Sequence, residues 1–211
     1  MRLKKIVVPI CILIAAGSIT AQNMKSLEFQ VGSFNPKDTP AGIIWDVKYG
    51  IAVDEAVDIH LGVAWFHKSY EEVSTVAVGE TESGVETTTK EAALEYTTNL
   101  LPITASATIH LPMNSPLGIY FGAGLSWQFL FNKENNYDDE ISETRTYNGG
   151  GWNARVGAEY ELGSKSSLIA EMFYNNCKVK GNKDKKEGLP VWDEVDVTGL
   201  GFKIGLRVEI Y

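Results

Sequence analysis

The sequence lacks the long apolar runs, the basic excess and the cysteine pairs that define several common protein classes. Only 44% of its 211 residues are apolar, whereas each span of a polytopic helical membrane protein needs roughly 20 mostly apolar residues. Acidic residues outnumber basic ones by 27 to 19, which argues against a nucleic-acid-binding protein. Two cysteines exclude a disulfide scaffold, and 22 aromatic residues (5 Trp, 9 Tyr, 8 Phe) argue against a disordered chain.

The N-terminus has the features of a secretory signal peptide. An apolar run, Ile6–Ala16, follows three basic residues and precedes small residues up to Ala21, and the run is too short to serve as a membrane anchor. We expect residues 1–21 to be cleaved, leaving residues 22–211 as a single domain. Loss of the three basic residues changes the formal charge from −8 to −11. Cys177 is then the single remaining cysteine, so no internal disulfide can form.

Beyond residue 22 the dominant pattern is strict alternation of apolar and polar residues, which is typical of β-strands with two different faces. The clearest examples are Ile43–Val53 and Leu200–Ile210. Each is about as long as the 9–11 residues of a tilted transmembrane strand, and longer than an ordinary strand of about five or six. Eight such segments are predicted: 26–34, 43–53, 57–67, 100–111, 117–131, 150–162, 167–177 and 195–211.

Short and long connections alternate between these segments. Residues 54–56, 112–116 and 163–166 form short links, whereas long polar stretches join the third to the fourth, the fifth to the sixth and the seventh to the eighth segments. Outer-membrane barrels combine short periplasmic turns with longer extracellular loops in this way. The pattern predicts an all-β fold, an eight-stranded antiparallel up-and-down transmembrane β-barrel with both termini on the periplasmic side.

Four tryptophans lie at the long-loop ends of predicted strands, and all four occupy positions on the apolar face of the alternation. Aromatic rings with a polar edge collect at membrane–water boundaries. We therefore predict one aromatic girdle, with Tyr49, Tyr160 and Phe29 as candidates for the opposite one. The predicted girdle consists of Trp45, Trp65, Trp127, Trp152 and Tyr174.

Alternation alone also fits a soluble lipocalin-type barrel with its polar face outward. The abundance of glycine on the polar face favours a cramped interior there, and the tryptophans cluster at one end of the apolar face. Leu101–Leu111 followed by Gly118–Leu125, and Gly157–Leu162 followed by Ser167–Tyr174, resemble the small outer-membrane β-barrel family, that is, the OmpA/OmpX/OmpW-like domains. The resemblance implies a Gram-negative outer membrane and insertion by the barrel-assembly machinery, which reads the last strand.

Charged residues of the polar face are expected inside this barrel, where an eight-stranded lumen has just enough room for side chains. Because buried charges must be paired, we predict a structural ion-pair network that plugs the barrel. Its predicted members are Lys48, Arg155, Glu159, Glu171, Lys203 and Arg207. A narrow ion path through the lumen is the alternative.

Enzymatic, metal and cofactor functions find little support in the sequence. Among lipid A-modifying barrels, the deacylases use a histidine, a serine and an acid at the rim, and His67, Ser69 and Glu71 could be considered. These residues are adjacent along one strand end, whereas members of a triad normally converge from separate segments. No His/Cys spacing indicates a metal ligand set. We expect no enzyme, no metal site and no cofactor.

The long loops carry most of the mature negative charge: residues 71–95 have a net charge of −6 and residues 133–145 of −3. Such loops are most often a solvated, variable surface, but they could also contact environmental ligands or bind lipopolysaccharide through divalent cations. Two functions stay open. One is a monomeric structural or adhesive barrel in contact with outer-membrane lipid and lipopolysaccharide. The other is an OmpW-like conduit for small apolar solutes.

Overall fold

The computed structural model describes residues 24–80, 86–111, 113, 115–137, 141–181, 184–186 and 189–210. The predicted signal peptide, residues 1–21, lies outside the described residues. Within the described ranges, no helix is long and apolar enough to cross a membrane.

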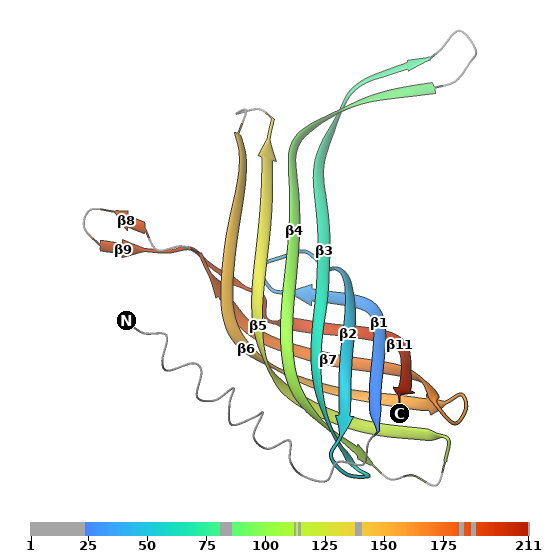
Figure 1. Ribbon diagram of the computed structural model, residues 1–211. Helices are drawn as coiled ribbons and strands as arrows, with labels where there is room; N and C mark the ends of the chain where they lie inside the picture. The colour runs from blue at the N-terminus through green and yellow to red at the C-terminus, as the bar shows by residue number, and fades with distance from the viewer. Residues whose placement is uncertain are drawn as a thin grey trace.

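Eight antiparallel strands close into a barrel (Figure 1). Each strand pairs with its sequence neighbours in the barrel, and the first pairs with the last, so that Lys25 lies opposite Ile210. The prediction of a closed eight-stranded antiparallel barrel is therefore confirmed. The barrel strands are β1 (Lys25–Pro36), β2 (Gly42–Ala52), β3 (Val57–Glu80), β4 (Glu86–Leu111), β5 (Leu117–Asn136), β6 (Ile141–Glu161), β7 (Ser166–Lys180) and β11 (Gly199–Ile210).

The last predicted segment, 195–211, was expected to be one strand, and this was wrong. The structure contains a short strand β10 (Glu194–Asp196) that pairs with the end of β7, and the barrel strand β11 begins only at Gly199. The Asp196 carboxylate accepts a hydrogen bond from the Thr198 amide at 3.0 Å, a local turn that interrupts the ladder. Two further short strands, β8 (Asp184–Lys186) and β9 (Leu189–Val191), form a separate hairpin.

Two of the long connections expected to be loops are largely strand. β3 and β4 remain paired as far as Glu80 and Glu86, and β5 and β6 as far as Asn136 and Ile141. Threonines and valines are frequent in residues 73–89, and such β-branched residues favour strands. Figure 1 shows the β3–β4 hairpin rising far beyond the barrel wall and bending away from it. We call this end of the barrel the long-hairpin end, and the opposite end the short-turn end.

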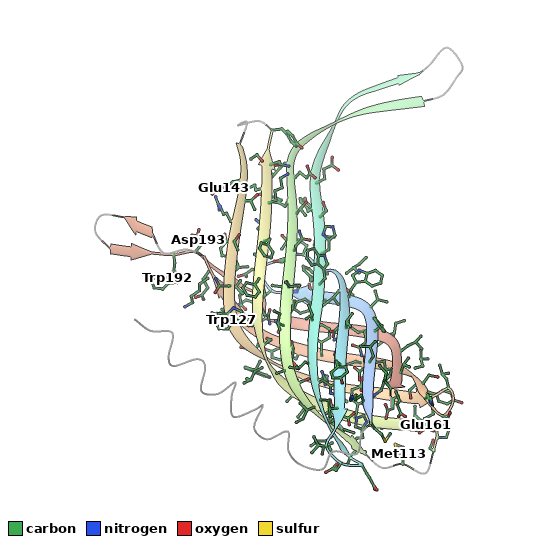
Figure 2. The ribbon with its side chains drawn as sticks, in the orientation of Figure 1. Met113, Trp127, Glu143, Glu161, Trp192 and Asp193 are labelled. Carbon is green, nitrogen blue, oxygen red and sulfur yellow. The ribbon has the colours of Figure 1, made fainter. Side chains whose placement is uncertain are left out.

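The two faces of the wall differ as the alternation predicted. Leu125 on β5 is 72% exposed, whereas its neighbour Ser126 is 7% exposed and points into the lumen. Exposed large apolar side chains continue around all eight strands. An apolar surface of this extent is unusual in a soluble monomer and is typical of a lipid-facing barrel. Glu161 and Met113 lie near the short-turn end, and Glu143 and Trp192 lie toward the other end (Figure 2).

Candidate functional site: the barrel lumen

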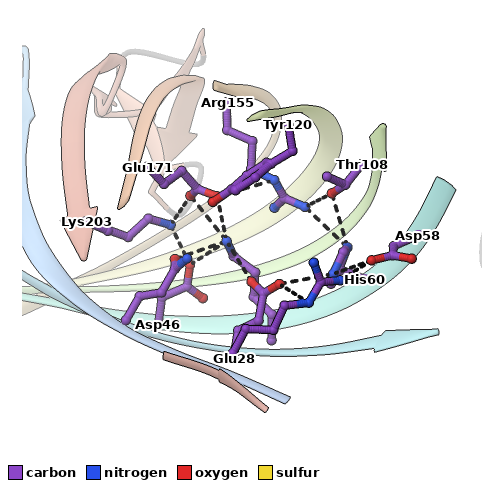
Figure 3. A network of polar contacts seen from close by, with 12 residues as sticks. Glu28, Asp46, Asp58, His60, Thr108, Tyr120, Arg155, Glu171 and Lys203 are labelled. Carbon is purple, nitrogen blue, oxygen red and sulfur yellow. Dashed lines mark hydrogen bonds and ion pairs between the residues drawn. The ribbon is translucent and has the colours of Figure 1, made fainter. Parts of the chain in front are cut away.

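A buried carboxylate, Glu171 on β7, is the centre of the lumen (Figure 3). Its oxygens accept hydrogen bonds from the ammonium groups of Lys48 at 3.0 Å and Lys203 at 2.9 Å. The guanidinium Nε of Arg155 lies 3.5 Å away, and the Tyr120 hydroxyl donates a hydrogen bond at 3.3 Å. Four strands, β2, β5, β6 and β11, therefore converge on this one acid.

Two more acids balance these three cations. Asp46 on β2 accepts a hydrogen bond from Lys203 at 2.5 Å and lies 3.7 Å from Lys48. Glu28 on β1 lies 3.6 Å from Lys48 and 3.3 Å from the ring of His60. All of these side chains are buried, and buried charges in such an arrangement are stabilised only by mutual pairing.

A second group of charges occupies the short-turn end of the lumen. Arg207 on β11 pairs with Asp58 and lies 3.2 Å from Glu159. The ring of His110 lies between the same two acids, with Nε2 3.0 Å from Asp58 and Nδ1 3.1 Å from Glu159. The Arg207 guanidinium lies 3.3 Å from the same Nε2, so the His110 ring contacts all three charged groups. Together the two groups contain five acids, four Lys or Arg cations and the rings of His60 and His110.

Glycine makes the central contact possible. A Cβ atom on Gly157 would lie 2.3 Å from the Tyr120 ring, so that any side chain at this position would force the ring to move. The absence of that atom on β6 leaves room for the Tyr120 ring, whose hydroxyl donates to Glu171. The geometric role of this glycine thus follows from a close approach and not from an unusual backbone angle.

An apolar layer covers the ionic network on the long-hairpin side. Ile44, Phe66, Leu100 and Leu130 lie opposite one another in a single cross-strand row, and all are at most 3% exposed. Phe34 packs between two aromatic rings, with centroid distances of 5.7 Å to Phe66 and 5.3 Å to Phe173. We call these six side chains the apolar layer.

Cavities follow the barrel axis on both sides of this layer. One of about 50 Å³ lies between the layer and the ionic network, against Ala64, Pro102 and Glu171. Another of about 190 Å³ is at the short-turn end beside Asp58 and His110. The largest of the three, about 380 Å³, lies at the long-hairpin end above Leu130. The apolar layer thus separates the outer cavity from the charged part of the lumen.

The structure distributes the six residues predicted for the lumen over both charge groups. Lys48, Arg155 and Lys203 surround Glu171, whereas Glu159 and Arg207 belong to the group at the short-turn end. Lys203 is the register partner of Glu171, but Arg207 lies opposite Ser167, four residues along the strand. The sequence analysis did not identify Tyr120 as a partner of Glu171, or His110 as a partner of Asp58 and Glu159. Both residues occupy lumen-facing positions of the alternating pattern, and this was the available signal.

The predicted girdle residues all lie on the outer face. Trp45 and Trp65 are register partners, with 58% and 46% exposure. Trp127 covers Gly150, and the rings of Trp152 and Tyr174 lie 5.5 Å apart.

The rim residues considered for catalysis do not contact one another. His67 Nδ1 lies 2.8 Å from the side-chain oxygen of Asn99 on β4, and alternation leaves Ser69 and Glu71 further along the same face of β3. Among the residues that the structure describes, no group of three His, Cys, Asp or Glu side chains could hold a metal ion.

At the long-hairpin end, ion pairs link the short strands to the wall. Glu194 lies 3.2 Å from the ammonium of Lys180 and 3.5 Å from that of Lys178. The hydrogen bond from Lys180 lowers the pKa of the Glu194 carboxyl. Asp196 accepts from Thr198, which lowers its pKa, and pairs with Lys37 at 3.5 Å.

Comparison with known proteins gives one family and several solved structures with a similar fold. The family model described as outer membrane protein beta-barrel domain matches residues 10–209, and no curated protein matches the sequence. Neisserial surface protein A shares 14% identity, with a TM-score of 0.56 and coverage of 90% of this chain and 99% of that one. OprG from Pseudomonas aeruginosa shares 12%, with a TM-score of 0.62 and coverage of 90% and 97%. A major outer membrane protein from Thermus thermophilus shares 12%, with a TM-score of 0.57 and coverage of 88% and 99%. At these identities the similarity concerns the fold.

Proposed function

The chain belongs to the outer membrane protein beta-barrel domain family, and on this premise we propose that it is a closed structural barrel that acts through its outer hairpins. In this proposal the long-hairpin end faces the outside and both termini are periplasmic. Trp45, Trp65, Trp127, Trp152 and Tyr174 mark the outer membrane boundary. The protein is a monomer in contact with lipid and lipopolysaccharide after insertion by the barrel-assembly machinery.

The observation that carries the proposal is the two-layer filling of the lumen. The network around Glu171 joins strands on opposite sides of the barrel, and the apolar layer covers it on the long-hairpin side. Removal of one partner from a buried ion pair typically costs about 3–5 kcal/mol. Lys48, Lys203 and Arg155 are therefore held in the lumen, and the side chains act as a plug.

Recordings in planar lipid bilayers test this plug. We expect purified wild-type protein to show no stable openings of a single size, because ions would have to displace paired charges and then cross an apolar layer. Reproducible openings of uniform conductance would contradict the proposal. Heat-modifiable migration in detergent gels shows that the protein is folded, and protease protection in liposomes of the same lipid shows that it inserts.

The acidic β3–β4 hairpin is the proposed contact surface. Its outer residues have a net charge of −6 over 71–95, which suits basic ligands or divalent cations that bridge to lipopolysaccharide. Deletion of residues 73–90 should reduce binding of the purified barrel to lipopolysaccharide in the presence of Ca²⁺ and leave heat-modifiable migration unchanged. Unchanged binding after the deletion would show that the hairpin is not the contact surface.

A conduit for small apolar solutes is the second candidate, and one feature of the wall favours it. The β3–β4 pairing has a gap at Ala64 and Trp65, opposite Leu101 and Pro102, because proline has no amide donor for the ladder. The 50 Å³ cavity lies behind this gap. Faster equilibration of an apolar dye into liposomes that contain the protein, abolished by substitution of Pro102, would support this function over the structural one.

We propose no catalytic role, including lipid A modification. His67 contacts Asn99 in place of the serine or the acid that a hydrolytic triad requires. Mass spectrometry of lipid A from cells that express the protein should show an unchanged acyl pattern. A change that is lost in His67→Ala would contradict this part of the proposal.

A further inference from the structure

The cavity at the long-hairpin end is built from three successive cross-strand rows. Its floor is formed by Leu130 on β5 and its register partner Tyr147 on β6, which are at most 6% exposed. Leu100 and Phe66 continue this cross-strand row within the apolar layer. The floor is closed because the apolar layer fills the barrel beneath it. A molecule that enters from outside therefore meets a blind pocket of about 380 Å³, within the usual range of about 300–1,000 Å³ for small-molecule sites.

The middle row supplies two available donors. Lys68, Thr98 and Asn132 are register partners on β3, β4 and β5, and all three line the cavity. The Thr98 hydroxyl donates to Asn132 Oδ1 at 2.8 Å, which leaves the Asn132 amide nitrogen available. Among the side chains that the structure describes, Lys68 pairs with no carboxylate. An ammonium and an amide NH₂ in one row match the two oxygens of a carboxylate.

The upper row and the opposite wall favour an aromatic body. Tyr70 and Tyr96 face each other with ring centroids 6.4 Å apart, and Pro40 and Val195 close the other side. Aromatic rings of this kind stack on flat apolar groups. Asp38 also lines the cavity, and one of its oxygens accepts from the Asp196 amide at 2.8 Å. This acid would repel a second anionic group but could accept a hydrogen bond from a hydroxyl.

We propose that this outer pocket binds small aromatic carboxylates, with the carboxylate on Lys68 and Asn132 and the ring between the tyrosines and the apolar floor. The binding goes beyond the structural role proposed above and does not require a conducting lumen. A hydroxyl opposite the carboxylate would donate to Asp38, so 4-hydroxybenzoate is the probe of choice.

Calorimetric titration of the refolded full-length protein tests the site. We expect 4-hydroxybenzoate to bind, and Lys68→Gln to weaken this binding about tenfold, the ratio that corresponds to loss of one charge-assisted hydrogen bond. The matched control is Lys133→Gln. Lys133 follows Asn132 on β5 and is exposed on the outer face, so this variant removes the same charge outside the pocket. It should change the affinity less than about twofold. Heat-modifiable migration shows that both variants are folded.

Neutral and saccharide probes supply the outcomes that would overturn the proposal. The neutral isostere 4-hydroxybenzamide should bind the wild type about as weakly as 4-hydroxybenzoate binds Lys68→Gln. Equal affinity of acid and amide, no binding of the acid at about 1 mM, or stronger binding of a monosaccharide that is unchanged in Lys68→Gln would each exclude an aromatic carboxylate site.

Discussion

The two halves of the lumen are built from opposite chemistry, although β3, β4, β5 and β6 line both. On the short-turn side of the apolar layer, charged side chains pair with one another around Glu171 and around Arg207. On the long-hairpin side, a wide cavity contains the ammonium of Lys68, which is unpaired among the described side chains. The difference shows how one fold can separate stability from recognition: paired charges hold the wall together, and an unpaired charge in an open pocket is available to a ligand.

The largest effect is expected from loss of the central acid. Glu171→Ala leaves Lys48, Lys203 and Arg155 buried around an empty position, which should lower the free energy of unfolding by about 3–5 kcal/mol. Equilibrium urea unfolding in lipid vesicles measures this change. Glu161→Ala, at an exposed position on β6, is the control. Equal stability of the two variants would show that the network is not what stabilises this half of the lumen.

Removal of a ring from the apolar layer should break the separation of the two halves. Phe66→Ala creates a cavity that joins the outer pocket to the small cavity below, at a cost of about 3 kcal/mol. We also expect frequent openings in planar bilayers. Phe202→Ala removes the same ring from the lipid-facing side of β11, where Phe202 is 53% exposed. If both variants stay closed, the ionic network alone seals the barrel.

A smaller effect is expected from crowding of the Tyr120 ring. Gly157→Ala places a methyl group where the ring lies and should destabilise the barrel by about 2 kcal/mol through overpacking. Tyr120→Phe, which keeps the ring and removes the hydroxyl, should cost about 1 kcal/mol. Urea midpoints of the two variants in one lipid compare them directly. A larger loss in Tyr120→Phe would mean that the hydrogen bond to Glu171 outweighs the packing.

The smallest effect concerns pH at the long-hairpin end. Asp196 has a lowered pKa because it accepts from Thr198. Its contribution is therefore present above the pKa of the unfolded chain and is lost as pH falls through the lower folded value. Acidification should lower the protection of the β10 amides against hydrogen exchange, measured relative to their intrinsic exchange rates, and Asp38 also accepts from the Asp196 amide there. Asp196→Asn should remove that pH dependence, and an unchanged profile would exclude Asp196 as its source.

Much of this arrangement could be predicted because side-chain direction alternates along a strand. Glu171, predicted for the lumen, shares its face of β7 with the buried Ile169 and Phe173, while Met172 between them is 53% exposed. Strand order alone places Lys203 or Arg207 beside Glu171, and the register of the two strands selects Lys203. The break near Asp196 was missed because the local turn depends on a single side-chain hydrogen bond, and the extent of β3 and β4 was missed because polar strands resemble loops.

What the sequence by itself determined was the strand count, the pairing order and the face of each residue, because a period of two is a local property of an extended backbone. Only the tertiary structure decided which charges meet. Lys48 on β2 reaches Glu171 on β7 across the lumen, over 123 positions in the chain, and no adjacency of strands brings them together. That contact depends on the diameter of the closed barrel, which also decides where side chains fill the lumen and where a pocket remains.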